Sequence, residues 1–257
     1  MLPNTRDRDI DFTFGIITAG SDHIKRIVDS IRRQNIPNYE IIILGNTNIS
    51  GNNIITIPFD ESIKKGWITK KKNIISQIAK YENIVFMHDY YELSEGWYEG
   101  FKKFGNAFQI CVNKITNLNG ERFRDYVLFK GILPIETTLL PYSYRLSPKL
   151  SKLAYISGGY YVVKRSIALK FPLLETLSWG QGEDVIFSQT LSRNNIIFEC
   201  NQYSSVHLLK EKGTCGFEKE MSEETFAMLC EWAETHGDQC FEDQCNFQNN
   251  WVSQFIK

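Results

Sequence analysis

The chain has 257 residues, and 42% of them are hydrophobic, which is enough for a globular protein with a sizeable core. Its 29 Lys and Arg residues almost balance its 30 Asp and Glu residues, so no global charge favours nucleic acid or an anionic membrane as a partner. Because no run approaches the roughly 18 apolar residues of a membrane span and no signal-peptide pattern opens the chain, we expect a cytoplasmic protein without a membrane span.

The first ninety residues alternate between strand and helix patterns. Strand patterns cover residues 10–18, 39–44, 53–58 and 83–87, and helix patterns cover residues 24–31 and 68–81. This order predicts an α/β fold with a mainly parallel sheet flanked by helices. Ligands of such sheets bind beyond the carboxyl ends of the strands.

Polar residues cluster where three of these strands end, at 18–22, 59–61 and 88–92. We expect the three clusters to converge on one cleft. The densest basic cluster, residues 70–73 (KKKN), lies at the start of the second helix, where free N–H groups suit a phosphate. Three successive lysines on a helix point in different directions, so at most one or two face the cleft. A solvated surface run is the alternative interpretation.

The middle of the chain has weaker patterns. We expect a short helix over 94–102, a strand over 108–114, and strands and loops that line an acceptor site over 119–151. A strand-like run over 154–163 contains Gly158 and Gly159. Glycines at such a place often allow the backbone to approach a ligand closely, and a bulge or a packing requirement is the equal alternative.

The most informative stretch is WGQGEDVIFS, residues 179–188, which places Glu183 and Asp184 in the first turn of a predicted helix that continues to Arg193. The positive end of the helix macrodipole favours carboxylates there, and the preceding glycines let the backbone come close to a ligand. The pattern can therefore hold a catalytic carboxylate rigidly. A capped helix with two solvated acids is the alternative.

The remaining residues predict further strands and a helical tail. Strand-like runs at 196–198 and 204–208 follow, and the second contains His207; a lone histidine is most often structural. Residues 214–235 have the pattern of an acidic amphipathic helix or helix pair, and the end of the chain is expected to pack on the body. No internal repeat is visible, so we expect one domain.

Together, these clusters resemble the GT-A fold of nucleotide-sugar-dependent glycosyltransferases, of the inverting, family 2-like kind. The segment WGQGEDVIFSQTL is similar to the W-G-x-G-E-D segment of such enzymes. The resemblance implies a Rossmann-like, mixed, mainly parallel sheet in a GT-A domain over 1–210. It divides that domain into a nucleotide-binding half, about 10–92, and an acceptor-binding half, about 93–210. Residues 211–257 would form a helical C-terminal extension packed on the same domain.

The resemblance also implies roles for residues around the two carboxylates. Asp184 corresponds to the base that deprotonates the acceptor hydroxyl, and Glu183 to an acceptor-binding partner. Trp179 would form the floor under a sugar ring, and Gly158 and Gly159 would let the backbone approach the donor sugar or the acceptor.

The segment Phe86–Tyr91 (FMHDYY) is similar to the strand end that carries the metal-binding DxD motif of this fold. A Mn²⁺ or Mg²⁺ ion would be bound by Asp89, His207 and the diphosphate of the substrate. Tyr90 stands where the family most often has a second Asp, which predicts weaker metal binding. The acidic turn that often follows the second strand is also absent, so the expected nucleotide-binding residues are Thr18, Asp60, Lys71, Asn73, His88 and Asp89.

The expected function is transfer of a sugar from a UDP- or dTDP-sugar to a hydroxyl acceptor, such as a glycan, with inversion. The proposed partners are therefore a nucleotide-sugar donor, UDP-linked above all, and a hydroxyl acceptor, and no nucleic acid. A non-catalytic module that binds sugar nucleotides or glycans is the main alternative. A nucleotidyltransferase is disfavoured because the segment TAGSDH after the first strand lacks a Gly-rich, Arg-containing loop.

Overall fold

The computed structural model describes residues 9–129, 138–142, 146–213 and 219–255. Its elements, in chain order, are β1 (Phe12–Ile17), α1 (Ile24–Arg32), β2 (Tyr39–Leu44), β3 (Ile54–Ile57), α2 (Ile68–Ile78), β4 (Asn83–His88), β5 (Tyr91–Leu93), α3 (Trp97–Phe104), β6 (Ile110–Thr116), β7 (Val127–Leu128), α4 (Pro148–Ser151), β8 (Ala154–Tyr155), β9 (Tyr160–Lys164), α5 (Arg165–Lys170), α6 (Glu183–Arg193), β10 (Phe198–Leu208) and α7 (Glu223–Val252). Among the described residues, no helix is long and apolar enough to cross a membrane.

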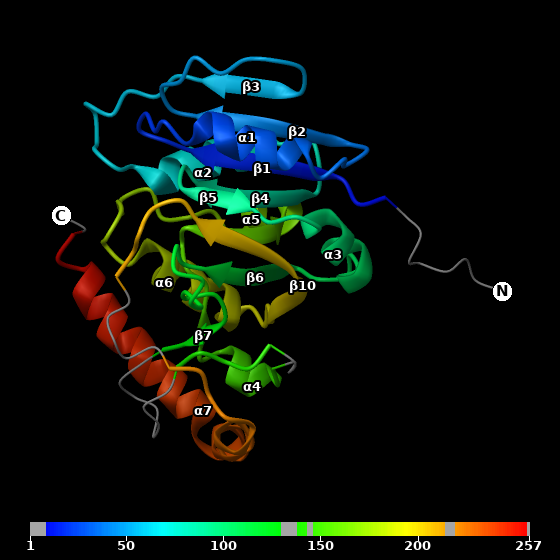
Figure 1. The fold of residues 1–257 in the computed structure, drawn as a ribbon. Helices are drawn as coiled ribbons and strands as arrows, with labels where there is room; N and C mark the ends of the chain where they lie inside the picture. The colour runs from blue at the N-terminus through cyan, green and yellow to red at the C-terminus, as the bar shows by residue number, and fades with distance from the viewer. Residues whose placement is uncertain (1–8, 130–137, 143–145, 214–218, 256–257) are drawn as a thin grey trace.

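An eight-stranded sheet in the order β3-β2-β1-β4-β9-β6-β10-β5 forms the centre of the molecule (Figure 1). Only β9 and β5 run against the direction of the other strands, so the predicted mixed, mainly parallel sheet is confirmed. β7 and β8 pair separately as a small antiparallel sheet.

Two hydrophobic layers cover the two faces of the large sheet. Apolar side chains of α1 and α3 pack on one face, and those of α2, α5, α6 and α7 pack on the other. Every residue of β1 and β4 is buried, as the continuous apolar runs predicted, because helices cover both faces of these strands. The sheet is therefore a rigid base for the loops at its edges.

Two elements, β10 and α7, differ from the sequence-based expectation, whereas α6 begins and ends as predicted. β10 is one strand of 11 residues, because residues 199–204 also extend along the sheet, with a register irregularity between Asn201 and Ser205. α6 begins at Glu183, because Gly180 and Gly182 adopt positive φ angles of 78° and 77° that end any earlier turn. α7 spans 30 residues, well beyond residue 235, because buried side chains recur along it to Val252.

The sheet topology brings distant segments together. β1 and β4 are parallel neighbours, and Ile17 pairs with His88, so their carboxyl ends lie side by side. β9 is antiparallel to β4, and the N–H of His88 donates to the carbonyl of Gly159 at 2.9 Å. The loop before β9 therefore lies at the same edge as the end of β4, where a cleft can form.

Candidate functional site

Two adjoining cavities lie at this edge. The first, of about 430 Å³, is lined by Glu183 and Asp184 and is called the carboxylate cavity below. The second, of about 510 Å³, is lined by four lysines and is called the lysine cavity. The two cavities share the lining residues His88, Tyr90, Trp179 and Lys212. They therefore form one continuous cleft with two chemically different halves.

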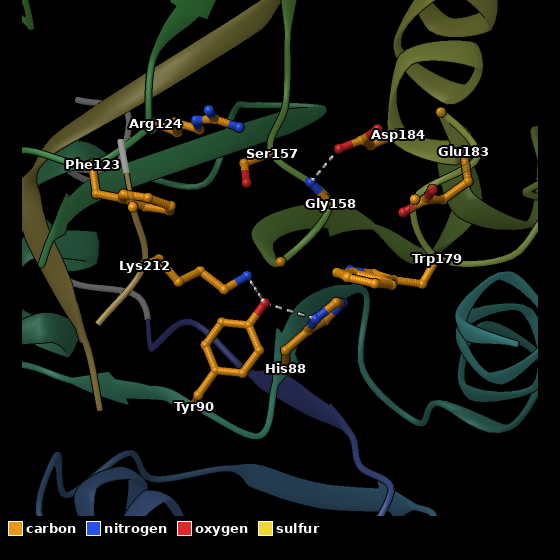
Figure 2. A pocket seen from close by; sticks show the side chains of 14 residues that line it. His88, Tyr90, Phe123, Arg124, Ser157, Gly158, Trp179, Glu183, Asp184 and Lys212 are labelled. Carbon is orange, nitrogen blue, oxygen red and sulfur yellow. Dashed lines mark hydrogen bonds between the residues drawn. The ribbon is translucent and has the colours of Figure 1, made fainter. Parts of the chain in front are cut away.

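The two carboxylates of the carboxylate cavity differ in environment. Asp184 accepts hydrogen bonds through Oδ2 from the Gly158 N–H at 3.1 Å and through Oδ1 from the Val185 N–H at 2.9 Å, and Figure 2 shows the first of these. Glu183 is only 7% exposed, and burial, assisted by the charge of Asp184, raises its pKa to about 7. Asp184 is thus a fixed, oriented carboxylate, whereas Glu183 titrates near neutral pH.

The three lysines at the start of α2 point in three directions. Lys70 forms an ion pair with Glu175 at 2.8 Å, outside both cavities. Lys71 donates to the Thr18 carbonyl at 2.8 Å and pairs with Glu61 in the lysine cavity. Lys72 is fully buried and donates to the Gly158 carbonyl at 2.5 Å.

Lys72 is a residue that the sequence interpretation did not single out. Burial lowers the pKa of its ammonium to about 8, although the negative charges of Glu183 and Asp184 act in the opposite direction. Its Nζ also lies 4.7 Å from the centre of the Tyr161 ring, a cation–π distance. It is therefore a buried cation held behind the two carboxylates.

Thr18, Lys71 and Asp89, three of the predicted nucleotide-binding residues, meet in the lysine cavity. The Thr18 hydroxyl donates to Asp89 Oδ2 at 2.6 Å and accepts from the Gly20 N–H at 2.9 Å. The loop after β1 is thereby tied to the end of β4.

His88, also predicted for this site, contacts the Tyr90 hydroxyl through Nδ1 at 3.1 Å (Figure 2). The Tyr90 oxygen accepts from Lys212 Nζ at 2.6 Å. Burial raises the pKa of Tyr90, so the phenol keeps its proton and donates it to Nδ1 of His88. Burial and the surrounding lysines hold the pKa of His88 well below its ordinary value, so the ring is neutral with its hydrogen on Nε2. That buried Nε2 has no hydrogen-bond partner among the described residues.

The glycine pair and Trp179 also lie at the cleft. A Cβ on Gly159 would come within 2.6 Å of the Tyr91 hydroxyl, and one on Gly158 within 3.1 Å of the Asp184 Cβ. Close packing therefore requires glycine at 159 and leaves little room for a side chain at 158, which favours the packing alternative for both. The Trp179 side chain is 66% exposed and lines both cavities, between the two halves of the cleft.

Three predicted residues are not brought to the cleft. Asn73 bonds to the backbone of Leu173 and to Glu175, on the far side of α2. Asp60 is exposed and accepts from the Ser62 N–H, and its neighbour Glu61 lines the lysine cavity instead. His207 lines neither cavity: its Nε2 lies 2.9 Å from Glu92, its cross-strand partner on β5.

The donor set does not fit the predicted Mn²⁺ or Mg²⁺ ion. Among the described residues, no group of three or more His, Cys, Asp or Glu side chains could hold a metal. Asp89 already accepts from Thr18, and the second carboxylate of the cavity, Glu61, is paired with Lys71. The ammonium groups of Lys210 and Lys212, which line the same cavity, repel cations. Hard divalent cations prefer several oxygen ligands, and this position offers one carboxylate.

Comparison with solved structures shows that this α/β protein has the GT-A glycosyltransferase fold. No protein-family model matches the chain, and no curated protein sequence matches it. Among solved structures, the chain is similar to the crystal structure of GalNAc-T7 with UDP, GalNAc and Mn²⁺, with a TM-score of 0.57 over 81% of this chain and 13% sequence identity. The chain spans about 45% of the length of that chain. At this identity the likeness shows the fold alone.

Proposed function

We propose that the chain is a glycosyltransferase that moves a sugar from a UDP- or dTDP-sugar to a hydroxyl acceptor, such as a glycan. The observation that supports this proposal most is that the two cavities adjoin and share four lining residues, His88, Tyr90, Trp179 and Lys212. One half offers carboxylates to an acceptor hydroxyl, and the other offers cations to a diphosphate. The fold shared with GalNAc-T7, whose crystal structure contains UDP and GalNAc, agrees with this division.

The carboxylate cavity suits the acceptor side of the reaction. The acceptor oxygen forms a bond to the anomeric carbon of the donor sugar while its proton passes to the carboxylate of Asp184. The bond from the anomeric carbon to the diphosphate oxygen breaks, and its electron pair stays on the diphosphate. Attack from the face opposite the leaving group gives inversion. Asp184 suits the role of base because two backbone N–H groups fix its orientation.

Glu183, Trp179 and the glycine pair complete the proposed sugar-binding half. With a pKa of about 7, Glu183 can accept or donate a hydrogen bond to an acceptor hydroxyl near neutral pH. The exposed ring of Trp179 offers an apolar face to a sugar ring. Gly158 and Gly159 line the carboxylate cavity with backbone atoms.

The lysine cavity suits the nucleotide diphosphate, with Thr18, Lys71, His88 and Asp89 on its walls. These residues belong to the proposed nucleotide-binding half, about 10–92, and Glu183 and Asp184 to the acceptor-binding half, about 93–210. Residues 211–257, of which 219–255 are described after residue 213, are proposed as a helical extension. No step is assigned to a metal ion, because the donor set around Asp89 does not fit one.

The test begins with a thermal-shift screen of nucleotide sugars and continues with transfer and hydrolysis assays on the best donor. Asp184→Asn is expected to lower turnover by about 10²–10⁴-fold, the usual contribution of a general base, and to leave nucleotide affinity nearly unchanged. The control is Asp243→Asn, an exposed carboxylate on α7 that bonds only to Gln239 among the interactions described for it. Full activity of Asp184→Asn would remove the base from this residue.

A second candidate function is a non-catalytic module that binds sugar nucleotides or glycans. The lack of a fitting metal-ligand set among the described residues favours it, since it leaves the position of Asp89 without the expected ion. Nucleotide-sugar binding without any transfer or slow donor hydrolysis would support this function over the transferase.

A further inference from the structure

The lysine cavity has more positive than negative groups. Lys65, Lys71, Lys210 and Lys212 line it against two carboxylates, Glu61 and Asp89. Lys71 is paired with Glu61, so the excess positive charge lies with the other lysines. A cavity with this charge is suited to a multiply charged anion.

Tyr90 gathers two of these lysines at the junction of the two cavities. The Lys212 ammonium donates to the Tyr90 hydroxyl at 2.6 Å, and Figure 2 shows this bond beside the one to His88. The Lys210 and Lys212 ammonium groups lie 4.0 Å and 4.2 Å from the centre of the Tyr90 ring. Burial, Lys210 and Arg124 together lower the pKa of Lys212 to about 8. Two ammonium groups beside one ring repel each other, and a bound anion would offset that repulsion.

The segment that carries these lysines is fixed to the fold. The Leu209 N–H donates to the Tyr90 carbonyl at 2.8 Å, and the Asn117 side chain donates to the Lys212 carbonyl at 2.9 Å. The buried Nε2–H of His88, which has no partner in the part of the chain that the structure describes, supplies one more donor at the same junction. The positive groups are therefore pre-organised rather than recruited by the ligand.

We propose that Lys210 and Lys212, held by Tyr90, bind the diphosphate of the donor and of the product in place of a divalent cation. This inference rests on the proposed function and specifies how its leaving group is neutralised. As the bond from the anomeric carbon breaks, its electron pair adds negative charge to the diphosphate, and the two ammonium groups lie where that charge develops. The sugar passes to the acceptor oxygen, the proton of the acceptor passes to Asp184, and the lysines keep their protons.

The experiment is calorimetric titration of pyrophosphate and of UDP into the full chain, in EDTA and again with Mn²⁺. We expect the same affinity in both buffers and at least a tenfold loss for Lys210→Ala/Lys212→Ala, since charge-assisted hydrogen bonds are the strong ones. Lys170→Ala is the matched control, because Lys170 is exposed on α5 and lines neither cavity. Binding that requires Mn²⁺, or a double variant that binds like the unchanged chain, would overturn the proposal.

Asp89→Asn distinguishes neutralisation of the diphosphate by lysines from neutralisation by a metal ion, because the two predict opposite changes in pyrophosphate affinity. Removal of a negative charge from the lysine cavity should leave pyrophosphate affinity in EDTA unchanged or raise it, whereas loss of a metal ligand would lower it. Tyr90→Phe removes the hydroxyl that Lys212 contacts and should weaken binding severalfold; unchanged binding would remove Tyr90 from the proposal. Thermal unfolding of each variant serves to check that the variant is folded.

The outcomes also separate this inference from the proposed function. Lysine-dependent pyrophosphate binding without any sugar transfer would keep the lysine site and reject the transferase. Sugar transfer that stops in EDTA would keep the transferase and reject the lysine site.

Discussion

The buried ammonium of Lys72 donates to the carbonyl of Gly158 at 2.5 Å, and the N–H of the same glycine donates to Asp184 at 3.1 Å. One residue of the loop before β9 therefore connects a cation on α2 to the proposed base on α6. Lys72 lines neither cavity. Its proposed role is therefore to position Asp184 and to place a positive charge behind Glu183.

Lys72→Met should shift the pH dependence of activity. The positive charge of Lys72 opposes the rise in the pKa of Glu183, so its removal should move that pKa upward from about 7. We expect the acid limb of the pH–rate profile to move to higher pH by up to roughly one unit, with kcat lowered about tenfold or more and KM little changed.

Lys70→Met is the control for that shift, since Lys70 is the preceding residue and pairs with Glu175 outside the cleft. The pH–rate profiles of both variants are measured under the same conditions. Equal profiles for the two would contradict a positioning role for Lys72.

Glu183 should make the free energy of unfolding depend on pH. Its pKa is about 7 in the folded chain against a model value of 4.5, so the folded state holds the proton more tightly than the unfolded state. The resulting stability is fully present below about pH 4.5 and is lost as pH rises to about 7. Denaturant unfolding at pH 5 and pH 8 should show that Glu183→Gln gains stability relative to the unchanged chain at the higher pH, by on the order of 2 kcal/mol.

Glu242→Gln is the control for this titration, because Glu242 is exposed and pairs with Arg193 on the surface. Its effect on the free energy of unfolding should be the same at both pH values. A pH-independent difference for Glu183→Gln would mean that Glu183 keeps an ordinary pKa.

The edge of the sheet where the site lies follows from sequence patterns. Buried runs predicted β1 and β4, and parallel pairing of Ile17 with His88 places their ends together. Which residue of each element faces the cleft was less predictable from the sequence. Lys71 and Asn73 are two positions apart on α2, which is about 200° around a helix, so one faces the cleft and the other faces Leu173.

The difference between the expected metal ligands and the observed contacts of His207 has a related cause. His207 pairs in register with Glu92, and that pairing of β10 with β5 depends on a three-residue strand whose pattern is too short to recognise. Lys210 and Lys212 gave a usable signal, because they directly follow the strand pattern at 204–208 and ligands of such sheets bind beyond the carboxyl ends of strands. The resemblance of FMHDYY to a metal-binding strand end instead implied that Asp89 and a metal ion bind the diphosphate.

Gly159→Ala should lower stability, because its new Cβ would lie 2.6 Å from the hydroxyl of the fully buried Tyr91. Displacement of a packed ring typically costs about 1–3 kcal/mol. Gly237→Ala on α7 is the contrasting variant: its Cβ would make ordinary contacts at 3.6 Å, and alanine in a helix is more favourable than glycine by about 0.8–1.0 kcal/mol. Thermal unfolding should therefore move in opposite directions for the two, and a shared direction would contradict the packing at Gly159.

The proposed helical extension, 211–257, should not be separable from the rest of the chain. In Figure 1, α7 runs along the side of the molecule at α4, and its buried side chains belong to the same hydrophobic cluster as those of the sheet. Phe241 is 3% exposed, so Phe241→Ala should cost about 3–5 kcal/mol, whereas Phe247→Ala, at 71% exposure, should cost almost nothing.

The denaturant unfolding of both phenylalanine variants is followed with two probes, one in the sheet and one in α7. If the chain unfolds as one cooperative unit, Phe241→Ala lowers the midpoint reported by the sheet as much as that reported by α7. Truncation after residue 221 should then leave Phe226 and Phe241 missing from the core and give a chain that does not melt cooperatively. A truncated chain with an unchanged, cooperative transition would show that α7 is a separate unit and would overturn the assignment of one domain.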